Sequence, residues 1–534
     1  MSKTKFKDLT PEQKEYLRYV YHSEKTHKEK TDVLSKKFGV NERTIRKWWQ
    51  NLDLKKQSYD LPPQLRKALE REINKDSKVL LITTAQNKTT LNEEFLQSLK
   101  VYQDFITTNL GKQTEIVIVP SRYRNPTSNI ETEKTKSEDW WDDSIEDLLF
   151  YGKVNFGDTL ISADSRISPT AKEPLLGYEL LASQGHVVLG HSKIHWRTLP
   201  RLRGEALRTM CTTGYLTNKN YSKSKAGEIG FEHHSYGFVI VELKEDNTCY
   251  IPRNVKVKSD GSFTDIIYSV NKDNVKVIDS SLGFVWGDIH NEVIDESFYK
   301  VSKDLVCNKL KPKKIVAHDV LDGFAFNPHE EKDLFIKRQK IVEGKHLIDK
   351  EIENVLNRLE DMKTCAEEFY VSESNHDIFA DRHINNFNWK NDLHNSPTYL
   401  KLAYIQQTID LRKYGNILGY LIWERFGESI KYVKMGETLK IADYECGQHG
   451  DYGSNGAKGQ TRGFSRINTK MIHGHTHSPM IHNNVTAVGV TCMLEQYYNR
   501  KGFSSWAHAH SIIHNNGKNQ LLVFDDDYSL SGLI

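Results

Sequence analysis

The 534-residue sequence has few cysteines and no long apolar run. Its six cysteines are widely spaced and form no C-x-x-C pair, which argues against a zinc ribbon, a thioredoxin-type motif and a dense disulfide framework. No stretch of about 18 apolar residues occurs, so we expect no membrane-spanning helix and no membrane partner. The first residues also lack the apolar core of a secretory signal. Together these absences predict a protein of the reducing cytoplasm.

Two catalytic motifs are missing as well. The sequence contains no G-x-x-x-x-G-K-[ST] loop, so it does not encode an ATP-driven motor. It contains no G-x-S-x-G elbow, so a serine-nucleophile hydrolase finds no support. We also find no repeat of fixed period along the chain.

The charge of the chain is unevenly distributed. The formal net charge is only +3, yet residues 1–60 carry 15 Lys/Arg against 9 Asp/Glu, which leaves the remainder at −3. Hydrophobic residues make up 38% of the chain and charged residues 27%, as in soluble globular proteins of two to four domains at this length. A basic N-terminal segment on a slightly acidic body favours contact between that segment and nucleic acid.

The N-terminal segment predicts three short helices within residues 9–52. Gly39 and Val40 supply a tight turn, and Asn41 is placed to cap the third helix. The segment resembles the helix-turn-helix of small DNA-binding and transposase-type domains. That resemblance implies an exposed DNA-contacting face made by Arg43, Thr44, Arg46 and Lys47. The alternative is a small three-helix bundle used for protein docking or oligomer contacts, and a homo-oligomer is possible.

Changes in composition divide the rest of the chain. Pro62 and Pro63 favour a linker over residues 61–76. Residues 77–280 begin with a β-α-β pattern and continue as short strands and turns, which predicts a mixed α/β middle region of unknown role. Residues 281–534 alternate strands and helices, and they contain the residue types that can bind metal ions or take part in catalysis. Residues 1–60 form the head in this scheme.

Four predicted strands end in clusters of metal-ligand residue types. The clusters are Asp288 with His290, Asp319 with Asp322, Asn375 with His376 and Asp377, and His475 with His477; His449 is a further candidate. The ends of strands in an α/β sheet meet at one crevice, and alternate residues point to the same side. Carboxylate, imidazole and amide donors together suit Mn²⁺, Fe²⁺ or Zn²⁺. A carboxylate can bridge two such ions, which together bind a phosphate.

These clusters, in this order, resemble the pattern of the calcineurin-like metallophosphoesterases over residues 281–530. The resemblance implies an α/β fold with a β-sandwich flanked by helices. It also implies a first metal held by Asp288, His290 and His477, a bridging Asp319, and a second metal held by Asn375, His449 and His475. His376 would contact the phosphate and protonate the leaving oxygen. Asp377 would orient His376, and Asp322 would contact the metal ligands without binding a metal itself. The sequence departs from the pattern where His318 and Ser374 replace glycines.

The sequence motifs indicate the type of reaction, but they indicate the substrate less closely. The helix-turn-helix head favours the nuclease branch of the family, the Mre/SbcD type, and the layout resembles the pre-early, first-step-transfer DNA nucleases of large tailed phages. We therefore expect a metal-dependent DNA nuclease, endo- or exonucleolytic, that acts on host DNA in the host cytoplasm. It would use two divalent ions, and we expect Mn²⁺, with Mg²⁺, Fe²⁺ or Zn²⁺ as alternatives. A phosphatase or cyclic phosphodiesterase, an RNA-processing nuclease and a non-catalytic DNA-binding regulator are the alternatives.

Overall fold

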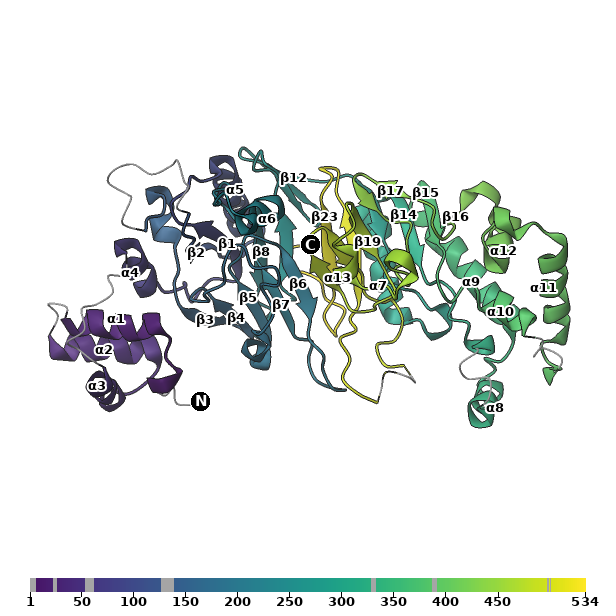
Figure 1. Ribbon diagram of the computed structural model, residues 1–534, viewed down its shortest axis with the longest axis horizontal. Helices are drawn as coiled ribbons and strands as arrows, with labels where there is room; N and C mark the ends of the chain where they lie inside the picture. Colours follow the sequence, from purple (N-terminus) through teal and green to yellow (C-terminus); the bar gives the residue numbers. More distant parts are fainter. Residues whose placement is uncertain are drawn as a thin grey trace.

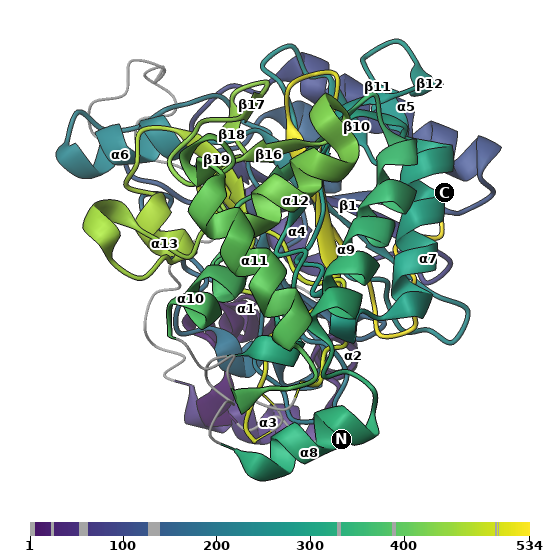
Figure 2. The same cartoon turned by 90° about the vertical axis from the view of Figure 1, so that its right-hand side faces the viewer.

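The computed structural model describes residues 6–22, 26–52, 62–125, 139–327, 333–386, 391–496, 499 and 501–534. The protein is a mixed α/β structure in which a helical head lies at one end of a long body built from several sheets (Figure 1). Helices gather at the opposite end, which faces the viewer in Figure 2. They are α9 (Ile348–Met362), α10 (Phe379–Asn385), α11 (Ser396–Thr408) and α12 (Ile417–Phe426). Within the described residues, none of the helices has the length and apolar character needed to cross a membrane.

The head contains the three predicted helices, α1 (Pro11–His22), α2 (His27–Phe38) and α3 (Glu42–Asn51). Gly39 ends α2 with a left-handed φ of 61°, a conformation that glycine adopts at little cost. The side chain of Asn41 accepts a hydrogen bond from the main chain of Thr44 and so caps α3. The helices close over a shared apolar core of Leu17, Leu34, Ile45, Trp48 and Trp49.

Residues 62–76, the described part of the expected 61–76 linker, contain regular structure. They include helix α4 (Pro63–Glu70), whose Leu65, Ala68 and Leu69 are buried. The amide of Tyr151 donates to the carbonyl of Ala68, which ties this helix to the body. The double proline therefore marks the start of a helix, since proline is well tolerated in the first helical turn, and the apolar residues four apart give that helix a buried face.

One layer of the body is a single ten-stranded sheet with the order β3-β4-β5-β7-β6-β20-β21-β19-β18-β17. Its first five strands are β3 (Lys153–Phe156), β4 (Thr159–Ser162), β5 (His186–Leu189), β7 (Thr209–Thr212) and β6 (His195–Thr198). Its other five strands are β20 (Met480–His482), β21 (Val485–Ala487), β19 (Lys470–His473), β18 (Tyr444–Glu445) and β17 (Lys440–Ile441).

Two further sheets pack against this layer. The four-stranded sheet has the order β2-β1-β8-β9 and consists of β2 (Thr114–Ser121), β1 (Val79–Gln86), β8 (Gly237–Glu242) and β9 (Arg253–Lys256). The six-stranded sheet has the order β23-β22-β13-β14-β15-β16 and consists of β23 (Asn519–Val523), β22 (Ala509–Ile513), β13 (Ser281–Val285), β14 (Pro312–His318), β15 (Glu368–Ser372) and β16 (Lys431–Val433). A small sheet of β10 (Phe263–Asp265), β11 (Tyr268–Val270) and β12 (Val275–Val277) completes the body.

The body has two halves, one built from strands β1–β9 and the other from strands β13–β23, and the two share one strand arrangement. β5 lies parallel to β4 and β7, and β7 lies antiparallel to β6; β19, β18, β21 and β20 repeat these relations in the second half. In the other layer, β1 is parallel to β2 and antiparallel to β8, as β13 is to β14 and β22. Helix α5 (Glu93–Asn109) follows β1, and α7 (Glu296–Asp304) follows β13 in the same way. β15 and β16 extend the second half alone.

Loop hydrogen bonds repeat along with the strands. The amide of Asp295 donates to the carbonyl of Thr491 at 3.1 Å, and the amide of Asn92 donates to the carbonyl of Leu216 at 3.0 Å. Asp295 caps α7 and Asn92 caps α5. No repeat is visible in the sequence, because the two halves keep strand order and cap positions while their side chains differ. The absence of a sequence repeat was therefore a poor guide to the architecture.

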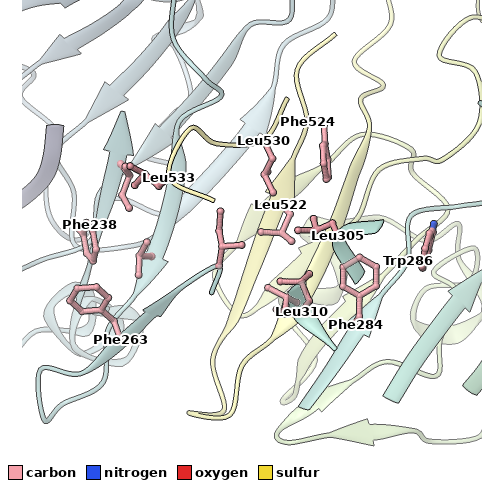
Figure 3. Close-up of a cluster of buried hydrophobic side chains, with 14 of the residues drawn as sticks. Phe238, Phe263, Phe284, Trp286, Leu305, Leu310, Leu522, Phe524, Leu530 and Leu533 are labelled. Atoms are coloured by element: carbon pink, nitrogen blue, oxygen red, sulfur yellow. The ribbon is translucent and has the colours of Figure 1, made fainter. Parts of the chain in front are cut away.

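The two halves meet at the β6–β20 pair, where Trp196 faces Ile481 and His195 faces His482. The middle region and the C-terminal region thus contribute strands to one sheet. The apolar core is also continuous: Figure 3 follows it from Phe238 and Phe263, past Leu533 near the C-terminus, to Phe284 of the second half. Cys307 and Cys365 form a disulfide bond, and the other four cysteines are free and buried.

A buried ion-pair network stabilises the contact between the two halves. Arg253 donates to both carboxylate oxygens of Asp265 at 2.8 Å and also pairs with Glu242. Tyr102 and Gln520 donate to Asp265 at 2.8 Å each. Burial alone would raise the pKa of Asp265, but the charge of Arg253 outweighs it and holds that pKa below the usual range.

Replacing Arg253 with methionine should lower the free energy of unfolding by about 3–5 kcal/mol, because two buried carboxylates lose their partner. Urea denaturation at neutral pH measures the change. Because the pKa of Asp265 is lowered in the folded state, its contribution is present above the ordinary pKa and fades as the pH falls through the lowered value. The difference between the proteins should therefore shrink in acid. Arg412→Met, at an exposed ion pair with Asp410, is the control and should change nothing measurable. An unchanged urea midpoint for Arg253→Met would show that the network contributes nothing.

Candidate metal centre

The predicted ligands lie on loops at one edge of the second half. β13, β14 and β15 are parallel neighbours, so their C-terminal ends meet at the same edge of the sheet. Asp288 and His290 follow β13, Asp319 follows β14, and Asn375 and His376 follow β15. In the facing layer, His475 and His477 follow β19. Both layers therefore direct ligand types to one place.

Four of these side chains form a compact buried group. Asp288, His290, Asp319 and His477 each offer a ligand atom, and all four atoms lie within 4.8 Å of one another. The Nε2 atoms of His290 and His477 are 3.2 Å apart. Nε2 of His477 lies 3.1 Å from Oδ2 of Asp288, and Nε2 of His290 lies 3.2 Å from Oδ2 of Asp319. Ligands around one ion at about 2.1 Å lie about 3.0–3.4 Å apart, so these spacings fit a single metal.

A second set of donors borders the first at Asp319. Nε2 of His449 lies 3.5 Å from Oδ2 of Asp319, and the rings of His449 and His475 have centroids 5.2 Å apart. Several buried atoms here have no hydrogen-bond partner, including Oδ1 of Asp319, Oδ1 of Asn375 and both ring nitrogens of His449. Buried polar atoms without partners are costly, and a metal ion would satisfy them. The donor set fits a second ion that shares Asp319.

The main chain at the ligands adopts an uncommon conformation. The φ angles of His290, Asp319, His475 and His477 are 44°, 49°, 67° and 57°. Non-glycine residues rarely have positive φ, and each instance costs about 1–3 kcal/mol that the surrounding structure must supply. Four strained residues that meet at one place are a structural sign of a functional site. No sequence pattern revealed this strain.

Gly474 allows the facing loops to approach closely. A Cβ atom at this position would lie 2.0 Å from Oδ1 of Asp288, well inside contact distance. The amide of His475 donates to Oδ2 of the same carboxylate at 2.6 Å. The glycine of the G-H-x-H motif therefore makes room for a ligand from the other layer.

Gly474→Ala should weaken metal binding by about 10–100-fold, the usual cost of disturbing what positions a ligand. Asp288 would have to move away from the position that completes the first set. Calorimetric titration with Mn²⁺ measures the affinity. Gly502→Ala, where an added Cβ meets nothing within 4 Å, provides the matched control. Equal affinities for the two variants would contradict the assigned role of Gly474.

The partners of His376 differ from the prediction. Nδ1 of His376 lies 2.6 Å from the main-chain oxygen of Asp322, while Asp377 accepts hydrogen bonds from the amide of Ser374 and the hydroxyl of Tyr432. The expectation that Asp377 orients His376 is therefore wrong. The two residues are adjacent, but the Asp377 carboxylate turns back into its own loop, where burial first, and then the charge of Asp319, raises its pKa to about 8.

Asp322 has the orienting role instead. Its carboxylate lies 3.0 Å from Nδ1 of His290, while its carbonyl accepts from His376. One residue thus fixes the ring of a metal ligand and the ring of the predicted proton donor. Burial tends to lower the pKa of His290, but the charge of Asp319 and its hydrogen bonds with Asp319 and Asp322 raise that pKa well above the usual range. Burial, followed by the charge of Asp319, raises the pKa of Asp288 to about 8.

The two departures from the family pattern are accommodated in the interior. His318 is fully buried, its ring centroid lies 5.8 Å from that of His449, and burial lowers its pKa to about 3. Ser374 is also fully buried and donates its amide to Asp377. Neither residue displaces a predicted ligand.

A loop from the first half also reaches this region. A surface pocket of about 520 Å³ is lined by Arg201, Arg203 and Trp506, among others. The Trp506 ring centroid lies 4.2 Å from that of His477, which places the pocket beside the metal ligands. Arg201 exchanges main-chain hydrogen bonds with Ser504. This contribution was not predicted from the sequence, because the loop carries no ligand motif.

The corresponding place in the first half lacks these chemical groups. The main-chain oxygen of Asp288 accepts from Thr491 at 2.7 Å, and Thr84 accepts from Leu216 at 2.8 Å in the same position. The Thr84 hydroxyl is bonded to that of Thr213 at 2.7 Å. Residues 84–88, which form the end of β1 and the two positions after it, include no carboxylate or imidazole. The first half therefore repeats the arrangement of strands without this set of ligands.

The predicted DNA-contacting residues lie on α3 of the head. Arg43, Arg46 and Lys47 are exposed, and Arg46 forms an ion pair with Glu42 at 3.3 Å. Thr44 is half-buried, and its hydroxyl donates to Asn41 at 2.9 Å as part of the helix cap. Three basic side chains are therefore exposed to solvent, while Thr44 takes part in the N-terminal cap of α3.

Comparisons with known proteins give one distant relative. The chain is 28% identical over 467 residues to Protein A1 of Escherichia phage T5, an alignment that covers 84% of this chain and 82% of that protein. No family model matches the chain, and no solved structure shows detectable similarity. The similarity to a phage protein agrees with the phage resemblance inferred from the sequence.

Proposed function

We propose that this protein is a metal-dependent DNA nuclease of phage origin that hydrolyses phosphodiester bonds with two metal ions. The observation that carries the proposal is the buried group of Asp288, His290, Asp319 and His477, bordered by a second set of donors around the same Asp319. Two divalent ions, Mn²⁺ in this proposal, would neutralise the scissile phosphate and lower the pKa of a water molecule. We place its action on host DNA in the host cytoplasm.

The residues of the chain would perform the remaining tasks. His376 would give a proton from Nε2 to the leaving oxygen when the ring is an imidazolium, whose other N–H, at Nδ1, donates to the carbonyl of Asp322. Asp322 would fix the orientation of both His376 and His290. The pocket beside Trp506 offers a place for the nucleotide next to the scissile bond. The basic face of α3 favours DNA over other phosphoesters.

The test is direct comparison of substrates with purified protein and Mn²⁺. We expect cleavage of double-stranded DNA that EDTA abolishes and that exceeds cleavage of RNA of the same sequence. Linear and closed-circular DNA distinguish exonuclease from endonuclease action. Hydrolysis of nitrophenyl esters without cleavage of DNA would replace the proposal by the phosphatase alternative. Absence of bound metal would favour the non-catalytic regulator.

Replacing Arg43, Arg46 and Lys47 together with alanine should weaken DNA binding and reduce its dependence on salt. Each lost phosphate contact reduces the magnitude of the negative slope of log affinity against log salt by about 0.9. Fluorescence anisotropy at several salt concentrations measures both quantities. The control replaces Lys276, Lys300 and Lys309, which are exposed on the body and carry the same total charge. Equal losses in the two triple variants would argue for a general charge effect and against a DNA-binding head.

A further inference from the structure

A second group of metal-ligand side chains lies outside the catalytic site. Glu173, His195 and His482 each offer a ligand atom, and these atoms lie within 4.8 Å of one another. His195 and His482 are buried, and Glu173 is half-buried. Two imidazoles and a carboxylate are a frequent protein ligand set for zinc.

The spacing of these groups fits a bound ion. Nε2 of His482 lies 3.4 Å from Oε1 of Glu173, and the centroids of the two imidazole rings are 4.5 Å apart. Ligands of tetrahedral zinc, at about 2.0–2.1 Å from the ion, lie about 3.3–3.4 Å from one another. Asn483 fixes the ring of His195, because its Oδ1 lies 3.1 Å from Nε2 of that ring. The contacts resemble those within the compact group of Asp288, His290, Asp319 and His477, where neighbouring ligand atoms lie 3.1–3.2 Å apart.

The position of the group gives it a structural consequence. His195 and His482 face each other across β6 and β20, the strand pair that joins the two halves of the ten-stranded sheet. They lie 287 positions apart in the chain, so no local sequence pattern connects them. β20 also begins shortly after the loop that carries His475 and His477. An ion at this place would link β6 to β20 and would stabilise the loop that carries His475 and His477.

We infer that Glu173, His195 and His482 bind a zinc ion, distinct from the catalytic ions, with water as the fourth ligand. The competing explanation is a plain ion pair. Oε2 of Glu173 lies 3.6 Å from Nη2 of Arg462, so Glu173 could serve Arg462 and a protonated His482 without a metal. The inference does not depend on the proposed nuclease activity, and metal counting separates the two explanations.

The experiment uses the full chain with the catalytic group disabled by Asp288→Asn and Asp319→Asn. This variant is loaded with zinc and desalted, and zinc is counted by mass spectrometry. We expect about one zinc ion per chain. Adding Glu173→Gln or His482→Gln should lower the count by one ion, whereas His186→Gln should not. His186 is a buried histidine of β5 that bonds to Thr209, so it controls for the loss of any buried imidazole.

Two results would overturn the inference. One is a catalytically disabled protein that retains no zinc; the other is an unchanged zinc count after both Glu173→Gln and His482→Gln. Circular dichroism establishes that each variant is folded, and Glu173→Gln keeps the test valid if His482→Gln unfolds. Cobalt provides a second measurement, because tetrahedral Co²⁺ absorbs strongly in the visible range. That absorption should disappear in Glu173→Gln and persist in His186→Gln.

Discussion

Replacing Asp319 with asparagine is expected to abolish cleavage and the binding of metal beside Asp319. Asp319 is fully buried, contacts His290 and His449, and has a carboxylate oxygen without a protein partner. An amide of the same size cannot supply the negative charge that two ions would share. Loss of the several kcal/mol of charge stabilisation that metals provide corresponds to about a 10³-fold lower rate or more. Metal content by mass spectrometry should fall from two ions towards none at the catalytic site.

The control for this variant is Asp443→Asn, which makes the same chemical change at an exposed ion pair with Lys470. Its metal content and rate should equal those of the parent protein. If Asp319→Asn retained two catalytic ions and cleaved DNA at the parental rate, the bridging role of Asp319 would be wrong. Retention of one ion with lost activity would instead restrict the role of Asp319 to one of the two sites.

Replacing His376 with alanine should lower kcat for DNA by about 10²–10⁴-fold, the usual contribution of a positioned proton donor. The metal content should remain at the parental value, because none of the four residues of the compact group is altered. The loss should be much smaller for a nitrophenyl phosphodiester, since nitrophenolate leaves without needing a proton. Comparing the two substrates therefore isolates the proton-transfer role.

His383→Ala is the matched control for this prediction. His383 lies on the helix that follows His376, and its ring packs on Tyr399 with centroids 4.7 Å apart. It should leave kcat within about twofold of the parent value, since this half-buried ring packs on Tyr399 and has no contact with the predicted ligands. An equal loss on both substrates in His376→Ala would indicate that the residue positions the phosphate and does not donate the proton.

All the candidate ligands except His449 were predictable because each lies at the end of an apolar strand within a short polar motif. The C-terminal ends of β13, β14 and β15 then meet by topology alone. The partner of His376 was not predictable in this way. Adjacency suggested Asp377, but the carbonyl of Asp322 reaches the ring from another loop, and only the folded chain brings these two loops together.

The repeated architecture was beyond the reach of sequence reasoning for a similar physical reason. Strand order depends on which edges pair, and many side chains satisfy the same pairing, as Asn92 and Asp295 illustrate at their helix caps. The helix α4 was missed because a double proline favours both a turn and a first helical turn. The histidines of the β6–β20 junction were missed because their partner lies in the other half of the chain.

The most direct test of the central claim is anomalous diffraction from crystals soaked in Mn²⁺. The account predicts two manganese peaks about 3.5–4 Å apart that flank Asp319. One peak should lie among Asp288, His290 and His477, and the other beside Asn375, His449 and His475. Absence of any peak at Asp319 in a protein that cleaves DNA, or two peaks elsewhere in the molecule, would contradict the assignment of this site as the catalytic centre.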